Sequence, residues 1–197
     1  MARERTISFQ PFNPNQPNLM TFDTSKYLRP LGILVALAIS SFVASAEVKL
    51  PSILGSHMVL QQGEPVPIWG WADPGEEVTV TFQGNKASAK ASSDGKWQVK
   101  LPSMKANAKG ANLVIKGSNE IKLEDVLVGE VWLCSGQSNM EWTVSRSANA
   151  KEEIANGKHP LIRHVKIPRR PSDKPENDVK TGGWQVCSPS TVANFTA

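Results

Sequence analysis

The sequence predicts a β-rich domain of β-sandwich or jelly-roll type over residues 47–125, followed by the incomplete start of an α/β domain over residues 126–197. Three observations predict this architecture. Apolar and polar residues alternate in the first part, turn residues separate the alternating segments, and at Asp125 the pattern changes to a nearly continuous apolar run followed by a helix-like stretch. Residues 1–46 are set apart as a leader.

The leader has the features of a secretory signal peptide after a disordered start. A mostly apolar run from Leu31 to Val43 follows Lys26 and Arg29 and precedes the small residues Ala44-Ser45-Ala46. We therefore expect cleavage before Glu47, a secreted or periplasmic protein, and no stable membrane insertion after signal removal. Tethering by an uncleaved signal is the alternative, although the run is shorter than the ~20 residues that span a bilayer.

Charge and cysteine content exclude several classes of protein. The 197 residues carry a net charge of +4, but the lysines of the β-rich part stand singly between apolar or small residues, so we expect no nucleic-acid partner. Two cysteines are too few for a disulfide-dense miniprotein or a four-cysteine zinc module. Export would permit a disulfide between Cys134 and Cys187, and two separate buried thiols are an equally valid interpretation.

Strands are predicted where apolar residues recur at every second position. The clearest segments are Val78–Phe82, Lys86–Lys90 and Trp97–Leu101. The turn sequences around them are Asp73-Pro74-Gly75, Gly84-Asn85, Ser93-Asp94-Gly95 and Gly117-Ser118-Asn119. Turns at this spacing indicate antiparallel hairpins in two packed sheets.

Two features of the β-rich part permit more than one interpretation. Trp69 and Trp71 are two positions apart, so both rings project from one face of a strand, where they either fill the core, which we favour, or form a sugar-stacking surface. His57 has no carboxylate or second histidine near it in the sequence and is predicted to be structural or exposed.

After Asp125 the order of elements is that of an α/β domain. The apolar run Val126–Cys134 predicts a strand covered on both faces in a parallel sheet. A helix is predicted near Ala148–Ala155, ended by Gly157, and a second strand over Leu161–Ile167. His164 lies inside that strand and is interpreted as structural.

Ser138 is the candidate nucleophile. A serine hydroxyl attacks only when it is exposed on a tight turn, near a base and near donors for the oxyanion, and Ser138 follows Gly136 at a predicted turn from strand to helix. A competing interpretation is that Ser138 and Glu141 form a capping box, in which the serine only caps the helix.

A resemblance to a known family favours the first interpretation. The block Val128–Glu141, with its Gly-Gln-Ser-Asn-Met core at residues 136–140, resembles the nucleophile segment of the sialate O-acetylesterase family in the SGNH hydrolase superfamily. Leu50–Gln62, Pro65–Trp71 and Gly183–Pro189 resemble other segments of the same family in the same order. The resemblance covers about residues 48–197.

The resemblance implies a function and a set of roles. It implies a β-rich domain before a flavodoxin-like esterase domain that hydrolyses O-acetyl esters on sialic acids or related acetylated glycans through an acetyl-serine intermediate, with no metal or organic cofactor. Ser138 would be the catalytic nucleophile and its N–H an oxyanion donor, while Gln137 and Asn139 would line the substrate pocket. A non-catalytic carbohydrate-binding module and an acetylesterase for other polysaccharides are the alternatives.

The sequence departs from the family pattern in its later blocks. In the superfamily these supply a glycine N–H and an asparagine side chain to the oxyanion hole, and an Asp-x-x-His segment supplies the base and its orienting acid. The residues three positions before His57, His159 and His164 are Leu54, Asn156 and Leu161, so no histidine here fits that segment. We therefore expect the chain to be an amino-terminal fragment without the catalytic histidine and aspartate, inactive by itself.

Overall fold

The structure is a computed structural model that describes residues 47–196, so the predicted signal peptide and its cleavage site lie outside the described residues. The described residues belong to one compact unit. Its strands are β1 (Val59–Gln61), β2 (Val66–Trp71), β3 (Glu77–Phe82), β4 (Asn85–Lys90), β5 (Lys96–Leu101), β6 (Asn107–Lys116), β7 (Glu120–Gly129), β8 (His159–His164) and β9 (Gln185–Cys187). Its helices are η2 (Ser138–Glu141), η3 (Val144–Arg146), α2 (Ala150–Asn156) and η4 (Val192–Asn194).

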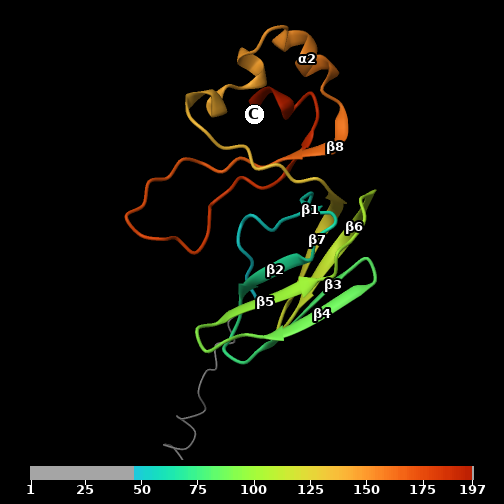
Figure 1. Ribbon diagram of the computed structural model, residues 1–197, viewed down its shortest axis with the longest axis vertical. Coiled ribbons are helices and arrows are strands. Elements are labelled where there is room, and N and C mark those ends of the chain that lie inside the picture. The colour runs from blue at the N-terminus through green and yellow to red at the C-terminus, as the bar shows by residue number, and fades with distance from the viewer. Residues whose placement is uncertain (1–46, 197) are drawn as a thin grey trace, which may run out of the picture. The chain divides into compact units, whose positions relative to one another are not determined.

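Two sheets share the main hydrophobic core. A five-stranded mixed sheet has the order β1-β7-β6-β3-β4, and β2 pairs with β5 in a separate two-stranded sheet (Figure 1). Alternate residues of both sheets are buried together, for example Ile68 and Val99 from the small sheet with Val80 and Leu113 from the large one. The strands predicted from alternation over 78–82, 86–90 and 97–101 are confirmed.

The β3–β4 hairpin shows why the predicted turn chemistry works. Only Gln83 and Gly84 connect the two strands, and their φ angles of 46° and 80° are both positive. Two-residue hairpin loops of this kind match the twist of the flanking strands, and glycine adopts positive φ without steric cost.

The structure corrects the prediction that Trp69 and Trp71 fill the core. In β2 the buried residues are Val66, Ile68 and Gly70, so the two tryptophans lie on the opposite, outer face. Trp69 is 37% exposed. Period-two spacing placed both rings on one face but could not say which face was buried.

The strand predicted over Val126–Cys134 is also corrected. Val126, Leu127 and Val128 are buried, and Leu127 and Val128 pair in parallel with β1, as a strand covered on both faces should, but the three residues are in the last part of β7 in the large sheet. The strand ends at Gly129, and Trp132 and Leu133 beyond it are 83% and 91% exposed. The apolar run therefore crosses the end of a strand instead of forming a new one.

A bulge lies in the middle of β7. Residues 111–113 of β6 face residues 123–126 of β7, so β7 carries one extra residue at this point. Asp125 has a φ of 53° there. Bulges redirect side chains and increase local twist, and aspartate is one of the few residues that tolerates positive φ.

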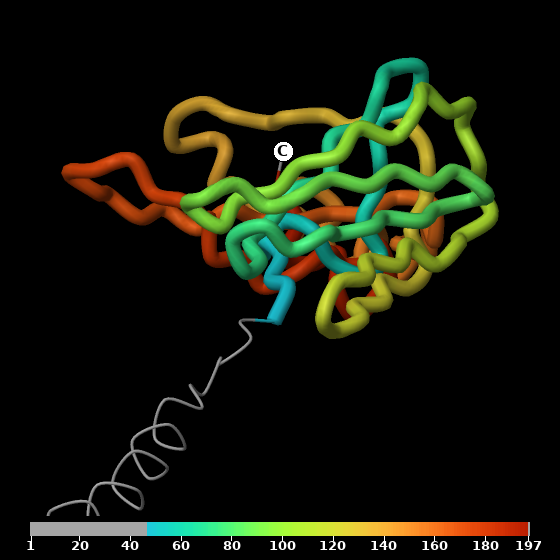
Figure 2. The backbone as a smooth tube through the Cα atoms, turned by 90° about the horizontal axis from the view of Figure 1, so that it is seen from below, coloured from blue at the N-terminus to red at the C-terminus, as the bar shows by residue number. Residues whose placement is uncertain are grey.

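Residues 130–196 contain short elements around a second, smaller core of Cys187, Val192 and Phe195. Helix α2 confirms the predicted helix, with Gly157 as its C-cap. The strand predicted over Leu161–Ile167 overlaps β8, which begins two residues earlier, ends three residues earlier at His164, and pairs antiparallel with β9. Figure 2 shows the segment between β8 and β9, in orange and red, as a long loop that extends from the strands.

The two cysteines are both free thiols. Cys187 is buried in the second core, whereas Cys134 is exposed. The disulfide alternative is therefore wrong, and the alternative of two buried thiols holds only for Cys187. Within residues 47–196 no helix has the length and apolar character needed to span a membrane.

Candidate functional site

Ser138 is exposed at the first position of the short helix η2. Strand β7 ends nine residues earlier at Gly129, and the intervening segment is exposed, so the serine is presented by a surface turn. The first bonded amide of this turn is that of Met140, which donates to Gln137 O at 3.0 Å. The N–H of Ser138 precedes it and makes no hydrogen bond within the described part of the chain.

The capping-box interpretation of Ser138 is wrong. The N-cap of η2 is Gln137, and no side chain caps the turn. Glu141 accepts a hydrogen bond from Arg169 Nη1 at 3.0 Å, so it does not reach back toward the serine. Since Ser138 Oγ has no protein partner within residues 47–196, its hydroxyl is free to meet a ligand.

The predicted pocket residues Gln137 and Asn139 flank Ser138 and are both exposed. Their side chains make no hydrogen bond within residues 47–196, while the carbonyl of Asn139 accepts the N–H of Trp142 at 3.0 Å. The structure therefore brings the three predicted site residues together on one turn. It brings no histidine into hydrogen-bond contact with Ser138 among the described residues.

The structure also contains a charged cluster that the sequence did not indicate. His57 Nδ1 lies 2.9 Å from Asp125 Oδ2, and Arg163 Nη1 lies 2.7 Å from the same oxygen. Because a carboxylate only accepts, both nitrogens donate to it. The sequence showed no carboxylate near His57 because Asp125 is 68 positions away and is brought next to it by the β7 bulge.

Backbone geometry holds this cluster in place. His57 has a φ of 67°, its N–H donates to Glu124 O at 2.9 Å, and Glu124 N–H donates to Ser56 Oγ at 2.9 Å. A Cβ at Gly110 would overlap Asp125 Oδ1, so only glycine permits the carboxylate to lie against β6 at this point. The two backbone N–H hydrogen bonds thus hold the loop before β1 against the bulge in β7.

Electrostatics of the cluster favour an ionised Asp125. The hydrogen bond from Arg163 is the largest influence and lowers the pKa of Asp125, partial burial opposes it, and the hydrogen bond from His57 lowers the pKa further. The Arg163 side chain is only 4% exposed, and its Nε has no partner within residues 47–196. The buried guanidinium therefore depends on this carboxylate for charge compensation.

The other two histidines do not form a catalytic pair. His159 is exposed at the start of β8. His164 stacks on Phe195 with ring centroids 4.3 Å apart, and burial, followed by the nearby charge of Lys166, lowers its pKa. Its stacking on a residue of the second core agrees with the predicted structural role. Among the described residues no group of three or more histidine, cysteine, aspartate or glutamate side chains is arranged to hold a metal ion.

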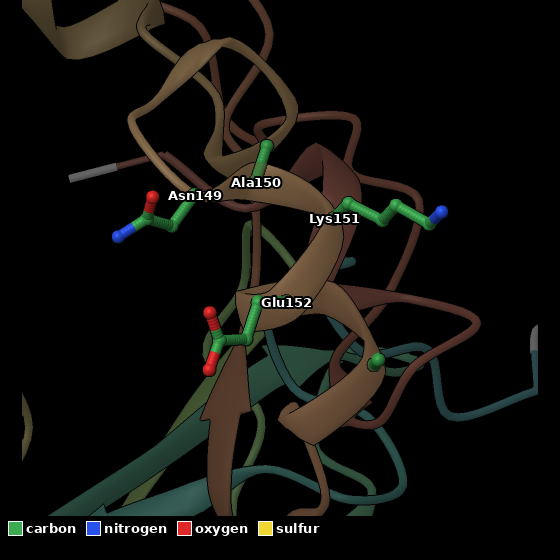
Figure 3. Close-up of a pocket in the computed structure, with 5 residues that line it drawn as sticks. Asn149, Ala150, Lys151 and Glu152 are labelled. Atoms are coloured by element: carbon green, nitrogen blue, oxygen red, sulfur yellow. The ribbon is translucent and has the colours of Figure 1, made fainter.

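A shallow depression at the start of α2 lacks the geometry of a site. Asn149, Ala150, Lys151, Glu152 and Ala155 line it. Figure 3 shows the side chain of Lys151 pointing away from those of Asn149 and Glu152, so its three polar side chains do not converge on one point. Binding sites need such convergence.

Comparisons with known proteins indicate the class of enzyme to which this arrangement is similar. No protein-family model matches the chain. Its fold is similar to the crystal structure of a carbohydrate acetylesterase from Xanthomonas citri, with a TM-score of 0.73 and 35% sequence identity over 77% of this chain and 35% of that one. The described fold is therefore similar to about a third of a carbohydrate acetylesterase.

Curated relatives specify the similarity further. Sialate O-acetylesterase from Rattus norvegicus is 36% identical over 142 residues, which cover 65% of this chain and 26% of the relative. The human enzyme is 40% identical over 121 residues, covering 55% and 23%. The resemblance to sialate O-acetylesterases is confirmed, and the chain spans about a quarter of the length of these relatives.

Proposed function

We propose that Ser138 is the nucleophile of a carboxylic ester hydrolase that removes acetyl groups from O-acetylated sialic acid. One observation carries this proposal: the hydroxyl is exposed on a turn, neither caps a helix nor bonds another side chain in residues 47–196, and lies in the segment that resembles the nucleophile block. Similarity to sialate O-acetylesterases supports the substrate class.

The reaction follows from the chemistry of an activated serine. Ser138 Oγ attacks the acetyl carbonyl carbon while a base accepts its proton. The negative oxygen of the tetrahedral intermediate then accepts a hydrogen bond from the backbone N–H of Ser138. The sugar oxygen leaves with that proton, which gives acetyl-Ser138. Water then attacks the acetyl-enzyme and releases acetate and the free serine. Gln137 and Asn139 border the substrate in this proposal.

The base and its orienting carboxylate come, in this proposal, from protein outside residues 47–196. The relatives extend over about four times the aligned length, which leaves room for these groups. The finer fold assignment belongs to the same proposal: the two sheets, the larger of which includes β7 as far as Gly129, are the halves of a sandwich domain, and the residues after Gly129 belong to an SGNH-type α/β domain. The exposed Trp132 and Leu133 would be covered by the remainder of that domain.

A second substrate class also has support. The solved structure with a TM-score of 0.73 is named a carbohydrate acetylesterase, without reference to sialic acid. The same serine would then deacetylate another acetylated glycan. Acetate release from 9-O-acetylated sialic acid and from acetylated xylan by the same preparation distinguishes the two, because the preferred substrate has the higher kcat/KM.

Labelling with a fluorophosphonate tests the nucleophile directly. The complete gene product is incubated with the probe, digested, and the modified peptide is identified by mass spectrometry. We expect modification at Ser138 and none in Ser138→Ala, while Ser135→Ala, a matched change of an exposed serine three positions earlier, still labels. Labelling of another serine, or unchanged labelling in Ser138→Ala, would contradict the proposal.

We also propose that the leader exports the protein. Its charge, apolar core and small-residue order support removal before Glu47. Mass spectrometry of the protein recovered outside the cytoplasm should find Glu47 at the amino terminus. A mature chain that begins upstream of Leu31 would refute the signal-peptide assignment.

A further inference from the structure

The outer face of the small sheet presents an aromatic surface that the proposed esterase site does not use. In the β2–β5 pair, Trp69 lies opposite Gln98 and Trp71 lies opposite Lys96. Together with Pro67, and with Asn177 from the loop between β8 and β9, these residues line an open hollow of about 510 Å³. This volume lies within the range of about 300–1,000 Å³ typical of small-molecule sites.

The polar groups beside the indole rings lack partners. The side-chain amides of Gln98 and Asn177 make no hydrogen bond within the described residues. Trp97 belongs to the buried face of β5 and is 3% exposed, so its indole N–H is not available to a ligand in the hollow. Free amides next to aromatic rings are the mixture that ligand sites use, with apolar rings for contact and a few polar groups for orientation.

Charge on the surface indicates the kind of ligand. The only cationic group lining the hollow is Lys96, and its Nζ is 2.9 Å from Asp94 Oδ2. This ion pair compensates the ammonium charge, so the hollow offers no unpaired cation to an acidic group. A ligand with a flat apolar face, a hydroxylated edge and no charge matches these groups. The C–H face of a pyranose ring stacks on an indole, and its hydroxyls reach the amides.

We propose that the Trp69–Trp71 hollow binds a neutral pyranose unit of a glycan chain. The site lies on the small sheet and shares no residue with the Ser138 turn, so its existence does not depend on the proposed nucleophile. In a glycan-modifying enzyme it would hold the carbohydrate chain near the protein, which raises the effective concentration of substrate. The proposal makes Trp69, the more exposed ring, the main stacking residue.

Calorimetric titration of the complete gene product tests the proposal. The probes are neutral β-linked hexasaccharides of glucose, xylose, mannose and N-acetylglucosamine, with 3′-sialyllactose as the acidic comparison. We expect binding of at least one neutral hexasaccharide, tenfold or more weaker in Trp69→Ala, because truncating a central aromatic contact commonly has such an effect. Trp69→Phe, which keeps a flat ring, should restore most of the affinity.

Two further variants keep the test decisive. Gln98→Ala changes an exposed side chain, so it should fold normally and still weaken binding. Lys100→Ala changes another exposed side chain of β5, one that does not line the hollow, and should leave affinity unchanged. The proposal is overturned if no neutral hexasaccharide binds, if Trp69→Ala binds as well as the parent, or if only the sialylated probe binds. Fluorophosphonate labelling of Ser138 in Trp69→Ala reports separately on the proposed function.

Discussion

Replacing Asp125 by asparagine should destabilise the protein through the buried Arg163. Asparagine tolerates the positive φ of this position and nearly matches the size of aspartate, so the change mainly removes charge. It leaves a guanidinium that is 4% exposed without a counterion, and it weakens two hydrogen bonds, of 2.7 and 2.9 Å.

The expected loss of unfolding free energy depends on how deeply the Arg163 and Asp125 side chains are buried. Removing one partner of a fully buried ion pair costs about 3–5 kcal/mol. Because the Asp125 side chain is 40% exposed, solvent screening reduces the expected loss to about 2 kcal/mol. With a urea m-value of about 2 kcal/mol/M, the unfolding midpoint should fall by about 1 M at pH 7.

The same interaction predicts a pH dependence. The pKa of Asp125 is lower in the folded protein than in the unfolded chain, where it is about 3.9. Its stabilising contribution is therefore fully present above that value and is lost as the pH falls through the folded pKa. The difference between the parent and Asp125→Asn should shrink as the solution is acidified below about pH 4.

A control at the adjacent position separates this effect from general charge removal. Glu124 is exposed and pairs with Lys122 at 3.2 Å on the surface, so Glu124→Gln should change stability by less than about 1 kcal/mol. If urea unfolding at pH 7 gives the same midpoint for Asp125→Asn and the parent, Arg163 does not depend on this carboxylate and the reasoning is refuted.

Three other predictions follow from the structure. Gly110→Ala should lower the urea midpoint by about 0.5–1 M, because the new Cβ displaces the Asp125 carboxylate. In a thiol-reactive dye assay Cys134 should react in the native protein and Cys187 only after unfolding, because the first is exposed and the second is 4% exposed. Proton NMR should show His164 titrating below about 6.5, so its contribution to folding stability rises with pH through this range.

Each of these predictions has a contradicting outcome. Gly182→Ala is the control for Gly110→Ala, since a Cβ at Gly182 meets no atom within 4 Å; equal effects of the two changes would refute the overlap argument. A single slow phase for both thiols, or a mass that shows a disulfide, would contradict the free, exposed Cys134. A His164 pKa above its ordinary value would contradict its burial against Phe195.

Local features of the fold could be predicted from the sequence because local chemistry determines them. The β3 and β4 strands follow from alternation, and the turn between them follows from Gly84, whose positive φ closes the hairpin. Helix α2 and its end at Gly157 follow in the same way. These features depend on neighbours in the chain, which a single sequence displays directly.

Features that depend on distant residues could not be predicted. The apolar run after Asp125 indicated burial on both faces. The sequence did not show that β1 would pair with this run, or that the pairing would stop at Gly129. His57 and Asp125 are 68 positions apart and meet because of a bulge that period-two alternation does not reveal. Nothing in the sequence predicted the positive φ of His57, and the only hint of the positive φ of Asp125 was that aspartate tolerates this conformation.

The same difference between local and distant features separates the Ser138 turn from the Trp69–Trp71 hollow. Ser138, Gln137 and Asn139 are adjacent in sequence, so one motif was sufficient to find them together on one turn. The Trp69–Trp71 hollow needed the structure, because spacing placed the rings on one face without showing that this face is the outer one.

The rate of acetate release by the complete gene product tests the central claim most directly. With 9-O-acetylated sialic acid as substrate, Ser138→Ala should lower kcat/KM by about 10⁴-fold or more, because no acetyl-serine forms without the hydroxyl. Ser135→Ala should retain the parent rate. Undiminished acetate release by Ser138→Ala would show that another group carries the reaction.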